Sequence, residues 1–204
     1  GHADNGPAGQ AVFGIIQGGA YEDLRAGSCQ AVSESGVDGI AIGGTLGRDK
    51  AEMADVLGFT VPTLPWGAPE HLLGIGEIDD LMKGIRLGID VFDCAVPTRL
   101  ARHGMALAPD PETRFRMNLR RSDMVGDRLP LVEGCPCVAC RDYDRDYINY
   151  ISRSEELTAV RLMVEHNLTY MEELMAGARK AITAGTYESY SAAVLDGKAP
   201  WDAL

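Results

Sequence analysis

The chain has 204 residues, of which 46% are hydrophobic and 24% are charged, a composition typical of a globular protein with a sizeable core. No apolar run approaches the ~20 residues of a membrane-spanning helix, and a formal net charge of -11 argues against indiscriminate binding of nucleic acid. The five cysteines are an odd number without a disulfide pattern, which favours a reducing, cytoplasmic setting.

The chain opens with a segment that lacks any pattern of regular structure and continues as alternating elements. Residues 1–10 are polar and glycine-rich, so we expect them to be disordered or a remnant of cloning. From there to about residue 98, apolar runs without internal alternation are separated by amphipathic stretches, which predicts parallel strands covered on both faces. The predicted strands are Ala11–Ile16, Gly39–Ile42, His71–Ile75 and Ile89–Phe92, and the predicted helices are Tyr21–Ser35, Asp49–Leu57 and Ile78–Leu87.

Glycines crowd the carboxyl ends of three predicted strands, at 18–19, 43–44 and 74–76. In an α/β sheet or barrel this end binds substrates, and glycine lets a ligand approach the backbone closely. A complete eight-stranded α/β barrel takes about 250 residues, whereas only about 90 residues here have the α/β pattern. Four parallel strands do not close, so either the chain is the carboxyl half of a larger enzyme or another chain completes the sheet.

Residues 99–128 form a basic stretch inside this acidic chain. Seven arginines face four acids, which gives a local formal charge of +3. A solvated loop would explain the pattern, and a contact zone for RNA phosphates is the sharper interpretation. The residues are Arg99, Arg102, Arg114, Arg116, Arg120, Arg121 and Arg128, with Asp110, Glu112, Asp123 and Asp127.

A compact group of metal-ligand residues follows. Cys135, Cys137 and Cys140 form a C-x-C-x-x-C group, and His166 lies 26 residues after the last of them. Three thiolates and one imidazole fill a tetrahedral zinc shell, so we predict a structural zinc site that pins the basic stretch to a following helix. A zinc hydrolase is excluded because the ligand set leaves no open position. The alternative is three buried, reduced cysteines and a histidine on a helix surface, but such close spacing favours a metal.

The remainder of the chain has helical periodicity. Helices are predicted over Arg141–Arg153 and Leu157–Ala184, with Gly185 as a stop signal and a last short helix near Tyr187–Leu195. We therefore expect residues 11–110 to form a partial α/β barrel and residues 111–204 to form a zinc-binding, helical subdomain.

Several motifs occur together in one order: Phe13-Gly-Ile-Ile-Gln-Gly-Gly19, Ala41-Ile-Gly-Gly44, His71-Leu-Leu-Gly-Ile-Gly76 and Gly88-Ile-Asp-Val-Phe-Asp-Cys-Ala-Val-Pro-Thr-Arg-Leu-Ala-Arg102. With the cysteine group and the segment Glu165-His166-Asn167-Leu168, they make the chain resemble the carboxyl-terminal half of a bacterial tRNA-guanine transglycosylase (queuine tRNA-ribosyltransferase) from about residue 11 to about residue 190. The resemblance implies an α/β fold: half of a (β/α)8 TIM barrel, about four parallel βα units, with an inserted or appended zinc-binding, helix-rich subdomain.

The resemblance also implies a reaction in which guanine at the wobble position of tRNA is exchanged for a 7-deazaguanine, either queuine or its precursor. Asp93 matches the nucleophile of the family, whose carboxylate attacks the anomeric carbon of the ribose to form a covalent intermediate. Taken alone, Asp93 could instead cap a turn at a strand end. Asp90 falls on the other face of its strand and is interpreted as structural, and His71 as a non-catalytic residue.

Further site residues are carried over from the same motifs. Gln17 matches the glutamine that reads the base through its carboxamide, and Gly44 matches the position whose amide meets the base carbonyl. Leu73 stands where family members often carry a methionine that packs on the base. Arg99 and Arg102 match arginines that grip the anticodon loop, although solvated surface arginines would give the same pattern.

Two departures from the family pattern bear on activity. The segment Thr45-Leu46-Gly47-Arg48-Asp49 lacks the glutamate that helps the family accept a cationic aminomethyl arm, and arginine in its place would repel that arm. The aspartate that acts as general base in the family belongs to the amino-terminal half of the barrel and has no counterpart here. We therefore expect this chain to be inactive alone.

Two functions of different classes remain. The first is the enzyme part described above, acting on the tRNA anticodon loop and a guanine or 7-deazaguanine base, as a homodimer or paired with an amino-terminal half, and away from membranes. The second is a non-catalytic, zinc-containing partner for tRNA binding or dimerisation. The retention of Asp93 inside an intact motif favours the enzyme.

Overall fold

The structure is a computed structural model that describes residues 7, 9–44, 47–65 and 67–204. Its internal contacts divide the chain into two compact units, Gly1–Cys94 and Ala95–Leu204. The division comes earlier than the boundary after residue 110 that the sequence suggests, because α5 (Val96–Arg102) and β5 (Met105–Leu107) both pack against the long helix of the second unit. Among the described residues, no helix has the length and hydropathy to cross a membrane.

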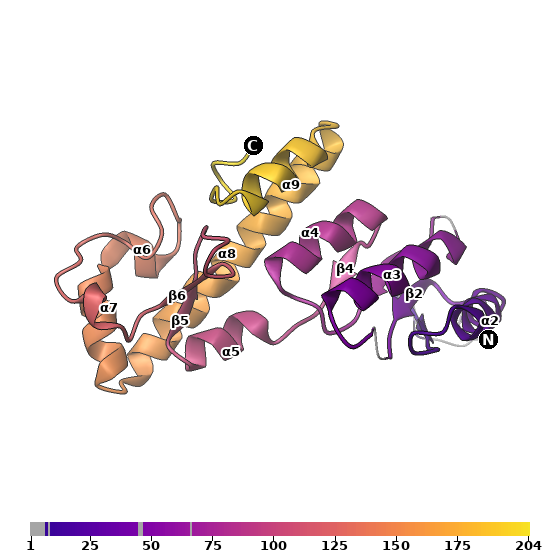
Figure 1. Ribbon diagram of the computed structural model, residues 1–204, viewed down its shortest axis with the longest axis horizontal. Helices are drawn as coiled ribbons and strands as arrows, with labels where there is room; N and C mark the ends of the chain where they lie inside the picture. Colours follow the sequence, from indigo (N-terminus) through magenta and orange to yellow (C-terminus); the bar gives the residue numbers. More distant parts are fainter. Residues whose placement is uncertain (1–6, 8, 45–46, 66) are drawn as a thin grey trace. The chain divides into compact units, whose positions relative to one another are not determined.

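The first unit is a four-stranded sheet with helices between its strands (Figure 1). All three strand pairs are parallel and the spatial order is β1-β2-β3-β4, which confirms the predicted alternation and pairing. The strands are β1 (Phe13–Ile16), β2 (Gly39–Ile42), β3 (Glu70–Leu72) and β4 (Val91–Phe92); the helices are α2 (Glu22–Ser33), α3 (Lys50–Thr60), η1 (Val61–Thr63) and α4 (Ile78–Leu87).

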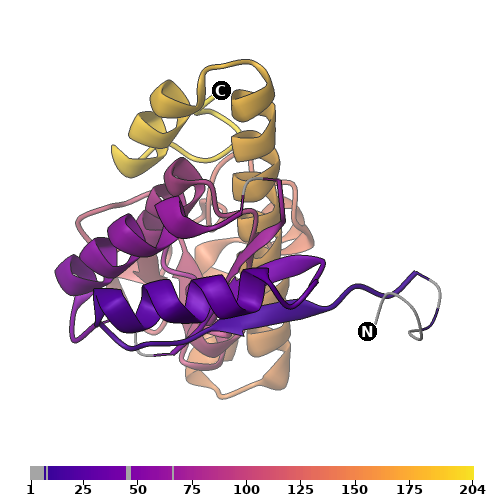
Figure 2. The same cartoon turned by 90° about the vertical axis from the view of Figure 1, so that its right-hand side faces the viewer.

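The helices of this unit cover one face of the sheet. Ile16 of β1 packs with Cys29 of α2, and the two elements run side by side in Figure 2. The side chains that alternate with Ile16 point to the other face, where Phe13, Ile15 and Val91 are 37%, 49% and 42% exposed. Within the described part of this unit the helices pack on one face of the sheet, so the prediction that both faces are covered is not met there.

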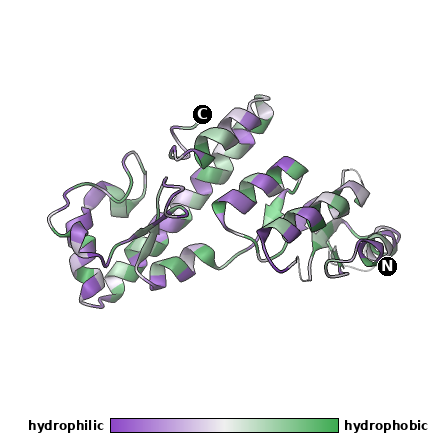
Figure 3. Ribbon diagram, viewed as in Figure 1, coloured by the Kyte–Doolittle hydropathy of each residue, from purple (hydrophilic) through white to green (hydrophobic). Residues whose placement is uncertain are grey.

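The second unit is built around the 27-residue helix α8 (Leu157–Thr183). Helices α5, α6 (Val138–Asp142), α7 (Arg145–Arg153) and α9 (Tyr187–Leu195) all contact it, as does β5. Strand β5 pairs with β6 (Arg116–Asn118) in an antiparallel hairpin, and η2 (Ser122–Met124) follows. Figure 1 shows α9 folded back along α8. In Figure 3 hydrophobic and hydrophilic residues alternate in bands along α8, so the helix has hydrophobic residues along its length against which other elements can pack.

Several elements differ from the sequence predictions. The single helix expected over Arg141–Arg153 is two helices, because the Asp144 side chain accepts a hydrogen bond from the Tyr147 N–H at 2.8 Å and starts α7 anew. Gly185 ends α8 as predicted, with a φ of 71° that suits glycine. Helix α5 and the β5–β6 hairpin were not predicted.

Two buried asparagines secure the irregular segments of this unit. Asn149 of α7 donates to the carbonyls of Leu119 and Arg121 at 2.6 and 2.8 Å, which holds the basic stretch. Asn167 of α8 is fully buried and bonds to backbone groups of both α5 and β5. Because a buried carboxamide is costly without partners, these bonds fix α5 and the hairpin on α8.

Candidate active site and metal centre

The four predicted metal ligands lie together in the second unit. Their ligand atoms are all within 4.8 Å of one another. The His166 Nδ1 atom is 3.6, 3.4 and 3.3 Å from the sulfur atoms of Cys135, Cys137 and Cys140. A tetrahedron with ordinary Zn–S and Zn–N bond lengths has an S···N edge of about 3.5 Å. The group therefore has the size of a tetrahedral zinc site.

The histidine ligand is oriented by the backbone. His166 is 0% exposed, so the alternative of a histidine on the helix surface is wrong. Its Nε2 atom lies 2.8 Å from the Leu107 carbonyl oxygen, and a carbonyl oxygen only accepts, so the ring proton is on Nε2. The lone pair of Nδ1 then faces the three sulfur atoms, which is the arrangement of a histidine ligand with a supporting hydrogen bond.

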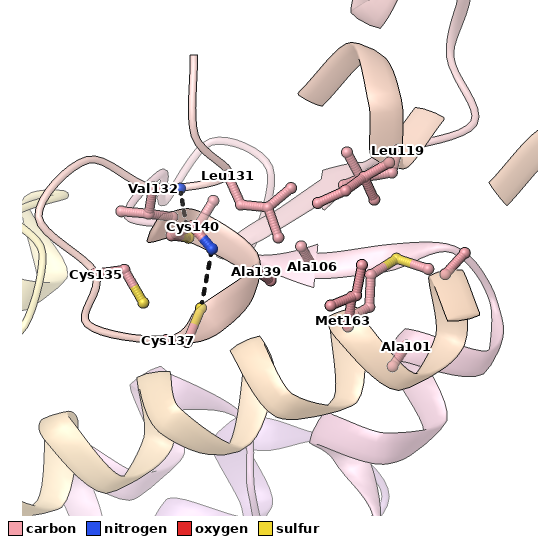
Figure 4. Close-up of a cluster of buried hydrophobic side chains, with 14 of the residues drawn as sticks. Ala101, Ala106, Leu119, Leu131, Val132, Cys135, Cys137, Ala139, Cys140 and Met163 are labelled. Carbon is pink, nitrogen blue, oxygen red and sulfur yellow. Dashed lines mark hydrogen bonds between the residues drawn. The ribbon is translucent and has the colours of Figure 1, made fainter. Parts of the chain in front are cut away.

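The cysteines are held by backbone N–H groups at the start of α6. The Cys140 N–H donates to the Cys137 sulfur at 3.3 Å, and the Val132 N–H donates to the Cys140 sulfur at 3.4 Å (Figure 4). Hydrogen bonds from the thiols of Cys135 and Cys140 lower the pKa of Cys137. All three sulfur atoms lie within 3.6 Å of the His166 Nδ1 atom of α8. A metal ion bound here would tie the cysteine loop to that helix.

The proposed catalytic and base-binding residues follow neighbouring strands of the first unit. The register pairs Ile16 with Ile42, Ile42 with Leu72 and Leu72 with Phe92. The next residues along the chain therefore form a row at the carboxyl edge of the sheet, on the face opposite the helices. This row is Gln17, Gly43, Leu73 and Asp93, with Gly44 adjacent.

Glycine is required where the Gln17 side chain crosses the end of β2. A Cβ atom at Gly44 would lie 2.6 Å from the Gln17 Oε1 atom, and one at Gly43 would lie 3.1 Å from Nε2. Gly44 also has a φ of 80°, which side chains of L-residues rarely adopt. The Gln17 N–H donates to the Ser28 hydroxyl of α2 at 3.0 Å. The carboxamide of Gln17 and the backbone of Gly44 therefore lie close together.

Asp93 presents a carboxylate that is 61% exposed. Its Oδ1 atom accepts a hydrogen bond from the Gly74 N–H at 3.2 Å and lies 3.0 Å from the Nε2 atom of His71. The His71 ring meets the Phe13 ring edge to face, with centroids 6.3 Å apart. The sequence suggests that His71 is a non-catalytic surface or loop residue, whereas the structure places it on β3 with its side chain 22% exposed and within hydrogen-bonding distance of the candidate nucleophile. Strand register was the missing signal, because His71 pairs with Val91, two residues before Asp93.

A cavity of about 380 Å³ adjoins this row and is lined in part by Gly44, Leu73 and Arg48. Thr45 and Leu46, which carry part of the departure from the family pattern, lie outside the described residues. The Arg48 side chain is 89% exposed and its Nε atom lies 3.1 Å from the Glu52 carboxylate. The charge of Glu52 offsets that of Arg48, which reduces the repulsion expected for a cationic base.

The opposite, amino-terminal edge of the sheet holds a pair of acids. The Asp90 carboxylate accepts a hydrogen bond from the Glu70 N–H at 2.9 Å, which agrees with a structural role for Asp90. Burial, together with the charge of Asp90, raises the pKa of Glu70 to about 7.

The candidate RNA-binding arginines lie on α5 in the second unit. Arg99 and Arg102 are exposed, and neither forms an ion pair with any residue that the structure describes. In contrast, Arg121 pairs with Asp123, and Arg128 pairs with Asp144 and a neighbouring acid. Part of the basic stretch is therefore neutralised within the chain, and the charges of Arg99 and Arg102 remain available to an anion.

Comparison with known proteins gives one consistent result. The family model described as queuine tRNA-ribosyltransferase matches residues 2–199. Curated proteins of that name are 44% identical over 178 residues in Roseiflexus sp. (strain RS-1), 42% over 188 residues in Solidesulfovibrio magneticus and 40% over 191 residues in Symbiobacterium thermophilum. These matches cover 87%, 92% and 93% of this chain but 44%, 49% and 47% of the relatives. The chain thus spans about half the length of the curated relatives it matches.

Proposed function

This chain belongs to the queuine tRNA-ribosyltransferase family, and from that premise we propose that it is the part of a tRNA-guanine transglycosylase that carries the nucleophile and a structural zinc site. The observation that carries the proposal is the row of Gln17, Leu73 and Asp93 at one edge of the sheet, beside Gly44. A binding partner without catalytic function would have no use for an exposed carboxylate that hydrogen bonds hold at the same sheet edge as Gln17.

Asp93 is the nucleophile in this proposal. One carboxylate oxygen forms a bond to the anomeric carbon of the wobble nucleotide while the bond from that carbon to guanine breaks, and the departing guanine takes up a proton. The incoming base, a guanine or a 7-deazaguanine, then loses a proton and displaces the carboxylate. Among the described residues, both hydrogen-bonding contacts of Asp93 use Oδ1. Oδ2 is left for the attack, and His71 with the Gly74 N–H sets the direction of the carboxylate.

The base binds over the adjoining strands. The Gln17 carboxamide can donate and accept along the edge of guanine, the Gly44 N–H meets the base carbonyl, and Leu73 packs on the ring. The absence of side chains at 43 and 44 supports this assignment, because it lets the Gln17 carboxamide lie across the end of β2, close to the Gly44 backbone. The preference between queuine and its precursor depends on the segment at 45–49, which lacks the glutamate that helps the family accept a cationic aminomethyl arm.

The rest of the chain supports the reaction indirectly. Zinc bound by Cys135, Cys137, Cys140 and His166 stabilises the second unit, and Arg99 and Arg102 of α5 bind phosphates of the anticodon loop. Action on tRNA, together with reduced cysteines, fits a cytoplasmic enzyme.

The fold that we propose is the carboxyl-terminal half of a TIM barrel with a zinc-binding subdomain. The uncovered sheet face, with Phe13, Ile15 and Val91 exposed, is the face that would line the barrel interior. The other half would cover it and supply the general base, so the chain alone is inactive. A homodimer is a further proposal for the assembled enzyme.

The test is base exchange in a completed enzyme. The chain is combined with the amino-terminal half of the Roseiflexus relative and incubated with tRNA and radiolabelled guanine, beside the chain alone. We expect incorporation of label in the completed enzyme and none in the chain alone. If the completed enzyme binds tRNA but incorporates no label, the chain is a non-catalytic, zinc-containing tRNA-binding or dimerisation partner instead.

A further inference from the structure

A buried arginine lies directly behind the two glycine loops of the candidate base site. Arg25 of α2 is 1% exposed, although arginine side chains are almost never fully buried unless their donors are satisfied. Neither the motif that contains Gln17 nor the one that contains Gly44 includes it. Its position inside the fold therefore calls for an explanation.

The guanidinium group bridges the loops that follow β1 and β2. Its Nε atom donates to the Gly19 carbonyl at 2.7 Å, and its Nη2 atom donates to the Gly43 carbonyl at 3.0 Å. Gly19 lies two residues after Gln17, and Gly43 immediately precedes Gly44. Because the guanidinium is planar and its donors have fixed directions, the two bonds set the distance between the loops as well as their orientation.

The same loops pack against the aliphatic part of the side chain. A Cβ atom at Gly18 would lie 2.8 Å from the Arg25 Cγ atom, and one at Gly44 would lie 3.8 Å from Nη2. Arg25 therefore lies against the first loop with the aliphatic carbons of its side chain and against the second loop with its guanidinium group. A shorter or unbranched side chain would leave at least one loop without support.

We propose that Arg25 is a positioning residue that holds the Gln17 carboxamide and the Gly44 N–H at the separation required to read one base edge. This inference rests on the proposed function for the assignment of Gln17 and Gly44 as base-binding groups. Arg25 does not touch the base. It acts on affinity and selectivity for the free base and leaves Asp93 and the tRNA-binding arginines unchanged.

Two substitutions at Arg25 separate its contributions, and one elsewhere serves as the control. Arg25→Met keeps much of the stem and removes both hydrogen bonds, whereas Arg25→Lys keeps the charge but cannot reach two carbonyls with a planar fork. The matched control is Cys29→Ala, one turn later on α2, because Cys29 is also buried and its sulfur bonds to Thr63 rather than to either loop.

The first measurement is amide hydrogen exchange in this chain, read for peptides that cover Gly18–Gly19 and Gly43–Gly44. Arg25→Met is expected to raise exchange in both loops together, and Cys29→Ala in neither. If Arg25→Met does not fold, Arg25→Lys is read instead, with the same expectation at smaller amplitude. Raised exchange in only one loop, or in neither, would contradict the proposal that Arg25 holds the two loops together.

The second measurement is competition between free bases in the completed enzyme. Substitution of Arg25 is expected to raise the KM for the base by about ten-fold or more while kcat and the KM for tRNA change little. A fall in kcat with an unchanged KM for the base overturns the positioning role. If the unsubstituted, completed enzyme exchanges no base at all, the proposed function fails, but the hydrogen-exchange result still decides whether Arg25 bridges the loops.

Discussion

Removal of one cysteine ligand should affect both the metal content and the stability of the protein. Cys137 is a buried ligand, and its sulfur also accepts the Cys140 N–H at the start of α6. A serine hydroxyl can accept the same hydrogen bond, so the cap is largely kept in Cys137→Ser. Loss of the metal leaves the His166 ring and two thiols buried without their common partner, which costs about 4 kcal/mol or more. For a chain of this size about 3 °C of melting temperature corresponds to 1 kcal/mol, so Cys137→Ser should lower it by more than ~10 °C.

The assay is metal analysis by mass spectrometry combined with thermal unfolding. We expect close to one zinc per chain before the substitution and little after it. The matched control is Cys29→Ser, which changes a buried cysteine that is not a metal ligand and should retain the zinc. A zinc-free protein of unchanged melting temperature, or a Cys137→Ser variant that keeps its zinc, would contradict a structural zinc site.

Three further predictions concern other charged groups. Arg99→Ala or Arg102→Ala should weaken tRNA binding and reduce the slope of log K against log salt by about one unit, whereas Arg128→Ala, which removes an internally paired charge, should leave the slope unchanged. The pKa of Glu70 is raised from its ordinary value of 4.5 to about 7, so the folded chain loses stability as pH rises from about 4.5 to 7; Glu70→Gln should match the parent near pH 4 and melt higher at pH 8, and an equal difference at both values would contradict this. His71→Ala should slow formation of the covalent adduct by about ten-fold with base affinity unchanged, whereas reduced affinity would place His71 in the base site.

The sequence predicted the sheet of the first unit closely because its apolar runs and glycines report local backbone requirements. It did not predict the β5–β6 hairpin or α5, since these elements depend on contacts with α8 through the buried Asn167, far along the chain. It joined α6 and α7 because periodicity alone does not show that Asp144 caps a new helix. Local pattern therefore failed where a distant or capping side chain decides the structure.

The candidate site was predicted in part for similar reasons. The close spacing of the cysteines predicted a shared metal centre. Three thiolates need one more ligand to complete a tetrahedral zinc shell, and His166 was the candidate that followed them. The contact of His71 with Asp93 and the bridge by Arg25 both require knowledge of strand register and of helix position on the sheet. Neither follows from the spacing of residues within one element.

Isolation of the covalent enzyme–tRNA adduct in the completed enzyme tests most directly whether Asp93 is the nucleophile. The adduct is captured under denaturing conditions and mapped by mass spectrometry after digestion. We expect a ribosyl linkage on the peptide that contains Asp93, and loss of the adduct with retained tRNA binding in Asp93→Asn. An adduct that persists in Asp93→Asn, or that maps to another residue, would contradict this assignment.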